Sequence, residues 1–191
     1  VVVGKVGAEL GRNLMPHQLA VGVKGGCEIG ARLAQVAYDV DLDMVEDGEE
    51  MCLIQLDLEN AFNMQGRRQI YDSLVERCPG LVRIFRALYG FKSKLYLGSG
   101  ECVGESGKGV RQGCPGAMLL FGCGGQNTLL ALHQAAMEVK EEVGSSLPAG
   151  ASGLADDTTL FIGEKGANTL IARAEEIFER NLSLIHISEP T

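Results

Sequence analysis

The spacing of apolar residues changes along the chain between the helical and the strand period. Apolar residues that recur at helical spacing predict amphipathic helices at residues 25–45, 67–77, 81–88 and 167–180. A longer apolar segment, which RQGCPG opens at Arg111–Gly116, predicts a helix that runs to about Val143. Gly122, Gly124 and Gly125 weaken this helix, so we expect a kink or a close backbone approach there.

Strand character is confined to shorter stretches. Met51–Leu58, MCLIQLDL, is a near-continuous apolar run, which predicts a strand buried on both faces. Gly153–Gly163, GLADDTTLFIG, carries two acids between runs of strand formers, which predicts a tight hairpin with its charge at the bend. A short strand is also predicted for residues 1–3 and strand-like alternation for 94–97, whereas the Gly-rich residues 101–108 predict a hairpin or a loop. Helices packed on a mostly antiparallel sheet belong to the α+β class, which is the predicted fold class.

The composition is that of a globular domain. With 191 residues and 46% hydrophobic content, the chain can bury one substantial core but hardly two independent domains. No apolar run approaches the roughly 20 residues of a membrane span, and no signal-peptide pattern opens the chain. Six cysteines are scattered without Cys-x-x-Cys or Cys/His ligand spacing, which favours reduced thiols in an intracellular protein.

Charge is distributed unevenly along the chain. The net charge of -8 argues against a simple nucleic-acid-binding surface. Residues 64–111, however, hold nine Lys or Arg and only four Asp or Glu. A basic middle in an acidic chain can bind a phosphate backbone locally, although an ordinary mixed surface would give the same count.

Both ends of the chain have features of a fragment. The sequence begins at Val1 in mid-pattern and without a methionine. Leu182–Thr191, LSLIHISEPT, breaks the helical pattern before it and resembles the translation of a sequencing adapter. Excluding this tail removes His186 from consideration and implies that the natural chain continues past Asn181.

Three carboxylates are the candidate residues for a functional site. Asp156 and Asp157 are adjacent. The repulsion between two neighbouring carboxylates is unfavourable unless a cation or hydrogen-bond donors compensate for it. The pair therefore suggests a divalent-metal site, with a solvated turn as the alternative. Asp57 interrupts the apolar run at its C-terminal end, where a charge is costly unless it faces a site.

A second group of acids resembles a calcium-binding loop without matching it. Asp39, Asp41, Asp43, Asp47 and Glu50 occupy the spacing of the ligands. The sixth position, which needs glycine for a sharp turn, and the eighth, where an apolar residue is expected, are Met and Glu. A solvated acidic loop is the better interpretation.

Three motifs in order resemble the reverse transcriptases, most closely those of non-LTR (LINE-type) retrotransposons and related retroelements. They are DLENAF at Asp57, GVRQGCPGAMLLF at Gln112 and LADDTTLFIG at Asp156. The stretch HQLAVGVKGGCE also looks like the segment before the first aspartate in LINE-type enzymes. The resemblance covers most of residues 1–180. It implies partial fingers at 1–50, a polymerase palm at 51–181, an adapter-derived tail at 182–191, and an absent thumb.

The resemblance also implies the metal site. Polymerisation is the in-line attack of a primer 3′-hydroxyl on a nucleotide α-phosphate, which two metal ions stabilise. By this resemblance Asp57 and Asp156 bind two Mg²⁺ ions, which Mn²⁺ can replace, the backbone carbonyl of Leu58 assists, and Asp157 supports the site. The role of the protein is then to position the primer and the nucleotide and to help neutralise charge at the reacting phosphate.

Further residues are implied to bind the nucleotide. Phe62 matches the aromatic steric gate that excludes a ribose 2′-hydroxyl, although an aromatic residue beside a strand also commonly packs in a core. Gln112 and Gly113 match residues that line the incoming nucleotide and the template. Lys5 and Arg12 are candidates for the cations that hold the triphosphate. The implied partners are an RNA template with a DNA primer and deoxynucleoside triphosphates, with no membrane; the sequence leaves the oligomeric state open.

Two departures from the family pattern keep alternatives open. Leu154 replaces the usual aromatic residue before Ala-Asp-Asp, and Gly116 stands where the family generally has leucine. The alternatives are a template-dependent RNA polymerase, and a non-catalytic remnant that binds nucleic acid or calcium. We also expect the isolated fragment to polymerise poorly or not at all.

Overall fold

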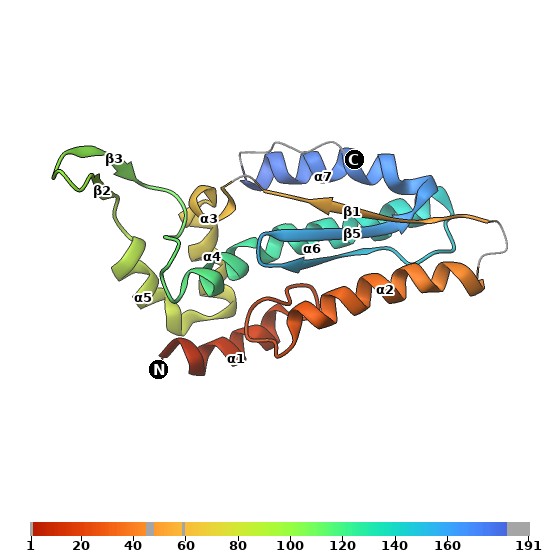
Figure 1. The fold of residues 1–191 in the computed structure, drawn as a ribbon, viewed down its shortest axis with the longest axis horizontal. Coiled ribbons are helices and arrows are strands. Elements are labelled where there is room, and N and C mark those ends of the chain that lie inside the picture. Colours follow the sequence, from red (N-terminus) through yellow and green to blue (C-terminus); the bar gives the residue numbers. More distant parts are fainter. Residues whose placement is uncertain (1, 45–47, 59, 183–191) are drawn as a thin grey trace.

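The computed structural model describes residues 2–44, 48–58 and 60–182 (Figure 1). Its helices are α1 (Val2–Leu14), α2 (Gly26–Met44), α3 (Ala61–Met64), α4 (Arg67–Arg77), α5 (Pro79–Tyr89), α6 (Ala117–Val143) and α7 (Glu164–Leu182). Its strands are β1 (Met51–Leu56), β2 (Ser93–Tyr96), β3 (Cys102–Ser106), β4 (Gly150–Leu154) and β5 (Asp157–Gly163). Helices and small antiparallel sheets are mixed along the chain, which confirms the predicted α+β class.

The main sheet has three strands in the order β1-β5-β4, and every pairing in it is antiparallel. The central strand β5 is joined to β4 by the predicted hairpin, in which Leu154 is paired with Asp157. On its other side β5 is paired with β1, with Met51 opposite Gly163 and Leu56 opposite Thr158. Strands from distant parts of the sequence therefore lie side by side, as Figure 1 shows.

Helices α6 and α7 cover one face of this sheet. Leu160 and Ile162 of β5 are fully buried against Leu132 of α6 and Leu170 of α7. The opposite face is open at β1, where Leu53 is 41% exposed. The expectation that β1 is buried on both faces is therefore wrong, because Leu53 and Gln55 are exposed on this face.

A second apolar cluster lies beside the first and shares α6 with it. Its buried residues come from α1, α4, α5 and the first half of α6, and include Leu10, Ile70, Phe85 and Cys123. The second half of α6 belongs to the cluster under the sheet. Helix α6 therefore connects the two parts of the core (Figure 1).

Close packing against the helix backbone explains Gly122 and Gly124 of α6, which is continuous from Ala117 to Val143. A Cβ at Gly122 would lie 2.7 Å from Val21, and one at Gly124 would lie 2.7 Å from Ile70. Segments on two sides of the helix therefore approach it more closely than a side chain would allow. Of the two expected possibilities, the glycines serve the close approach.

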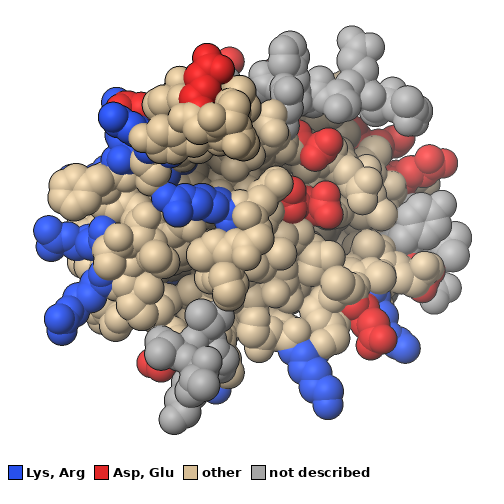
Figure 2. All heavy atoms as spheres, turned by 60° about the vertical axis from the view of Figure 1, so that its left-hand side comes forward, with Lys and Arg blue, Asp and Glu red and all other residues tan. Residues whose placement is uncertain are grey.

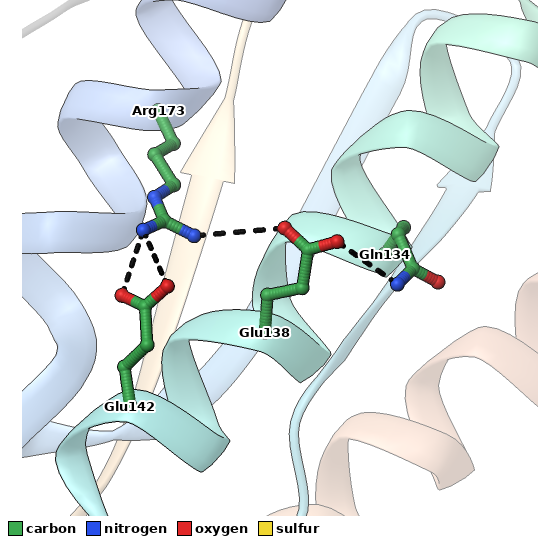
Figure 3. A network of polar contacts seen from close by, with 4 residues as sticks. All are labelled: Gln134, Glu138, Glu142 and Arg173. Carbon is green, nitrogen blue, oxygen red and sulfur yellow. Dashed lines mark hydrogen bonds and ion pairs between the residues drawn. The ribbon is translucent and has the colours of Figure 1, made fainter.

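A polar network joins α6 to α7 at the surface (Figure 3). Arg173 of α7 donates to both carboxylate oxygens of Glu142, at 2.8 and 2.7 Å, and forms an ion pair with Glu138 at 3.7 Å. Gln134 donates to Glu138 from one turn earlier. The hydrogen bond to Glu142 raises the pKa of Arg173.

The N-terminal region differs from the sequence prediction. A strand was expected at the β-branched start of the chain, but residues 2–14 form α1. Leu10 and Leu14 follow each other at helical spacing and are both fully buried, so tertiary packing outweighs the local strand propensity. The predicted strand at 94–97 is confirmed as β2, and residues 101–108, expected as a hairpin or loop, contain β3, which forms a separate hairpin with β2.

The backbone also bears on the calcium-loop alternative. Helix α2 continues to Met44, so Asp39, Asp41 and Asp43 lie on helical backbone, where they cannot form the first half of such a loop. Asp47 lies outside the described residues. In the described part of the chain, no helix is long and apolar enough to cross a membrane.

Candidate functional site

The end of β1 and the tip of the β4–β5 hairpin meet at the same edge of the sheet. Because Leu56 is paired with Thr158, Asp57 and Asp157 each lie one residue beyond this last pair. Side chains alternate between the two faces of a sheet, and Leu56 and Thr158 are buried whereas both acids are exposed. Asp57 and Asp157 therefore belong to the open face, at the same end of it.

Asp156 lies in the two-residue turn between the strands and is half-buried. Ala155, the first residue of the turn, has φ 61, and Asp156 is not among the residues with positive φ. A two-residue hairpin loop with positive φ only at its first position is a type II′ turn, which prefers glycine there. This turn thus holds an alanine in the left-handed region directly before the two acids.

Among the described residues, the side-chain carboxylates of Asp57, Asp156 and Asp157 make no hydrogen bond or ion pair. Their oxygens are the hard donors that Mg²⁺ and Mn²⁺ prefer, so the residue types fit such ions. Among the described residues, however, no group of three or more acidic, His or Cys side chains is already arranged around a common metal position.

Leu58 connects the acidic edge to the interior. Its carbonyl accepts a hydrogen bond from the Ala61 N–H at 3.2 Å, which leaves one lone pair of this oxygen for another partner. Its side chain packs against both apolar clusters. Together with Ala155 and Thr158 it lines a cavity of about 30 Å³ directly under the turn.

Phe62 follows in the short helix α3 and is half-buried. Its ring stacks on that of Phe121, with centroids 4.4 Å apart and an interplanar angle of 24°. It therefore packs against the first apolar cluster while keeping part of its surface exposed. This arrangement is compatible with a steric gate and equally with a core residue.

The loop that carries Gln112 and Gly113 is tied to the same region. The N–H groups of Gly109 and Val110 donate to the carbonyls of Gln65 and Phe62, at 2.8 and 2.7 Å. Gln112 and Gly113 follow as exposed residues. Gly113 has φ 83 and open space where a Cβ would lie, so it is backbone conformation that favours glycine here.

A tyrosine between two arginines supports this loop. Arg67 and Arg111 lie over the ring of Tyr89, with distances to the ring centroid of 5.2 and 5.9 Å. Arg67 also donates to the Gly109 carbonyl at 3.0 Å and to Ser106 at 3.2 Å. Burial and the neighbouring Arg111 lower the pKa of Arg67.

Of the two candidate cations of the N-terminal region, Arg12 is not joined to this group in the described contacts. Arg12 is exposed on α1, which packs on α6, and in the described contacts it makes no bond to any of the other candidates. The side chain of Lys5 lies outside the described part of the structure.

Charge is unevenly distributed on the face shown in Figure 2, where more Lys and Arg lie on the left and more Asp and Glu on the right, although both signs occur on either side. The sequence has its excess of basic residues between 64 and 111. Positive charge on this face can attract a polyanion.

The sequence reasoning missed two residues that organise the site, Arg67 and Gln18. Arg67 was visible only as one of many basic residues. Gln18 contacts the hairpin turn from 137 positions away in the sequence, at Ala155. No local pattern marks such a contact, because it exists only once the chain has folded.

No protein-family model matches the chain, and no curated protein matches it. The motif order and the geometry of the sheet edge are therefore the basis for assigning a function.

Proposed function

We propose that this chain is part of an RNA-directed DNA polymerase of the non-LTR retroelement type, comprising the palm and part of the fingers. The observation that carries the proposal is the strand order β1-β5-β4, in which Leu56 is opposite Thr158. Two motifs nearly 100 residues apart thereby bring Asp57 and Asp157 to one end of one open face. An acid pair in a hairpin beside an acid at a strand end can supply oxygen ligands to two divalent ions, which supports the proposal.

In this proposal the protein binds and orients the reactants. When bound, two divalent ions would activate the primer hydroxyl and neutralise charge at the transferred phosphate. Asp57 and Asp156 would hold the ions, with Asp157 and the free lone pair of the Leu58 carbonyl in support. The open face of the sheet leaves room for a primer and template, which the neighbouring basic residues would attract.

Phe62 and the loop at Gln112–Gly113 would shape the nucleotide site. The stack on Phe121 fixes the Phe62 ring, so the exposed part of the ring can exclude a 2′-hydroxyl by contact alone. The loop is bonded to the carbonyl of Phe62 itself, which couples the two motifs mechanically. The substrates would be deoxynucleoside triphosphates, on an RNA template with a DNA primer.

Metal binding by the chain itself tests the proposal most directly. We expect Asp57→Asn and Asp156→Asn each to weaken Mn²⁺ binding by about tenfold or more, measured by electron paramagnetic resonance of free Mn²⁺. Asp72→Asn is the matched control, because Asp72 is an exposed acid of α4 that pairs with Arg68. Equal Mn²⁺ affinity in all four proteins would contradict the proposal.

Nucleotide choice separates the proposal from an RNA polymerase. In a longer polypeptide that includes this chain, we expect primer extension with dNTPs, and Phe62→Val should admit NTPs. Extension with NTPs by the unchanged protein would favour the template-dependent RNA polymerase instead. The 191-residue chain alone is expected to extend a primer poorly or not at all.

A further inference from the structure

We propose that Gln18 is a positioning residue that holds the turn at Ala155 in the conformation that presents Asp156 and Asp157 to the metal ions. This inference rests on the proposed function, since it concerns how the acids of that site are held. It adds a residue from outside all three motifs.

The segment around Gln18 lies along the outer edge of β4 and continues its pairing. The Leu19 N–H donates to the Gly153 carbonyl at 2.8 Å, and the Gly153 N–H donates to the His17 carbonyl at 2.7 Å. These two bonds form a parallel bridge between Gln18 and Gly153. Gln18 is thereby fixed two residues from the turn.

From this position the side-chain amide of Gln18 contacts both polar groups of Ala155. The Ala155 N–H donates to Gln18 Oε1 at 3.0 Å, and Gln18 Nε2 donates to the Ala155 carbonyl at 3.3 Å. Gln18 Oε1 also accepts from the Ala20 N–H at 3.1 Å, and the residue is only 4% exposed. The amide is therefore held at both ends and cannot turn over without losing these bonds.

The carbonyl that Gln18 contacts belongs to the peptide group joining Ala155 to Asp156. Type I′ and type II′ turns differ by a flip of this central peptide, and the flip changes the backbone conformation at both central residues. With alanine rather than glycine at the first position, the turn has no intrinsic preference for type II′. The bond from Gln18 Nε2 supplies this preference, and so fixes the direction in which the Asp156 side chain leaves the turn.

A second buried glutamine offers a matched control for this role. Gln126 is 3% exposed and donates from Nε2 to the Leu14 carbonyl at 3.1 Å. It joins α6 to the end of α1 and does not contact the hairpin. Replacing either glutamine by methionine preserves size. The Gln18 variant loses three hydrogen bonds and the Gln126 variant loses one, so both should lose stability and Gln18→Met should lose more.

The experiment measures Mn²⁺ affinity and thermal midpoint for the 191-residue chain. We expect Gln18→Met to weaken Mn²⁺ binding by about tenfold, whereas Gln126→Met should leave it within about twofold, although both variants lower the thermal midpoint. Adding Ala155→Gly should restore most of the affinity of Gln18→Met, because glycine favours the type II′ turn by itself. The same addition should not change the affinity of Gln126→Met.

Each outcome has one meaning. If Gln18→Met binds Mn²⁺ as well as Gln126→Met does, or if Ala155→Gly gives no rescue, Gln18 merely supports the fold and this inference fails alone. If Asp57→Asn and Asp156→Asn also leave Mn²⁺ binding unchanged, both the proposed function and the inference about Gln18 are contradicted.

Discussion

At the scale of single residues, two histidines contact the backbone of one residue of the hairpin, Ala151. The Ala151 N–H donates to Nδ1 of His133 at 3.2 Å, and His17 Nδ1 lies 3.4 Å from the Ala151 carbonyl. The two rings lie 4.4 Å apart. Burial, and then the nearby His17, lower the pKa of His133. Its neutral form is the one that can accept the Ala151 bond.

We therefore expect the chain to lose stability in mild acid through His133. Its pKa is lower in the folded than in the unfolded chain, so the unfolded chain binds the proton more tightly. The stability that neutral His133 contributes to the fold is complete above the ordinary histidine pKa of about 6.5, and it is lost as the pH falls below that value. His133→Asn keeps an acceptor but cannot be protonated, so urea unfolding between pH 7.5 and 5.5 should depend less on pH in this variant. Parallel curves for the two proteins would exclude His133 as the cause.

Site residues could be predicted where they belong to a local sequence motif. They could not be predicted where folding brings them together from distant parts of the chain. Asp156 and Asp157 could be assigned to a hairpin bend because strand formers flank them on both sides. Gln18 and His133 act on that hairpin from other elements. Neither has a local signature, since glutamine and histidine occur in every kind of structure.

At the scale of elements, the crossing of α4 and α6 depends on one glycine. A Cβ at Gly124 would lie 2.7 Å from Ile70 Cγ1 and 2.9 Å from Gln65. Gln65 itself is 1% exposed and donates to the Phe121 carbonyl at 3.2 Å. Neither neighbour can move without disturbing the core beside the candidate site.

Two adjacent glycines of α6 should consequently respond in opposite directions to alanine. Gly124→Ala should lower the free energy of unfolding by about 1–3 kcal/mol, because the new methyl group overpacks the crossing. A Cβ at Gly125 would meet only Gln65 Nε2 at 3.7 Å, an ordinary contact. Gly125→Ala should therefore raise the free energy by up to about 1 kcal/mol through helix propensity. Chemical denaturation measures both, and a loss of equal size in both variants would refute the packing argument.

The elements themselves were largely predictable, and the exceptions have physical causes. Periodicity predicted α2 at 25–45, and the helix is found at Gly26–Met44. The strand predicted at the start of the chain is wrong because the helical spacing of the buried Leu10 and Leu14 outweighs the strand propensity of three β-branched residues. The error at β1 arose because an apolar run does not reveal how many faces neighbouring elements cover.

At the scale of the whole molecule, α6 makes the two apolar clusters interdependent. Cys123 in its first half belongs to the cluster with α4 and α5, and Ala136 in its second half belongs to the cluster under the sheet. Both residues are fully buried. Loss of either cluster removes the packing of half of one helix, so the molecule should unfold as one unit.

Thiol reactivity at the two positions tests this cooperativity. Burial raises the pKa of the Cys123 thiol to about 12, so it should resist alkylation at pH 8 until the protein unfolds. In Ala136→Cys, pulsed alkylation followed by peptide mass spectrometry should give the same urea midpoint at both cysteines. Exposed Cys27 and Cys102 should react at every urea concentration and serve as internal controls. Two separate midpoints would mean that the clusters unfold independently.

The β2–β3 hairpin stands apart from both clusters and projects from the body of the molecule (Figure 1). Its outer edges are not paired with another strand in the described part of the chain, and Leu95, Tyr96 and Val103 are each about half exposed or more. One such ribbon can extend another by edge-to-edge pairing, and apolar side chains favour that contact. We therefore expect residues 93–106 to promote self-association, and Leu95→Lys to raise the concentration at which the protein precipitates, as measured by turbidity.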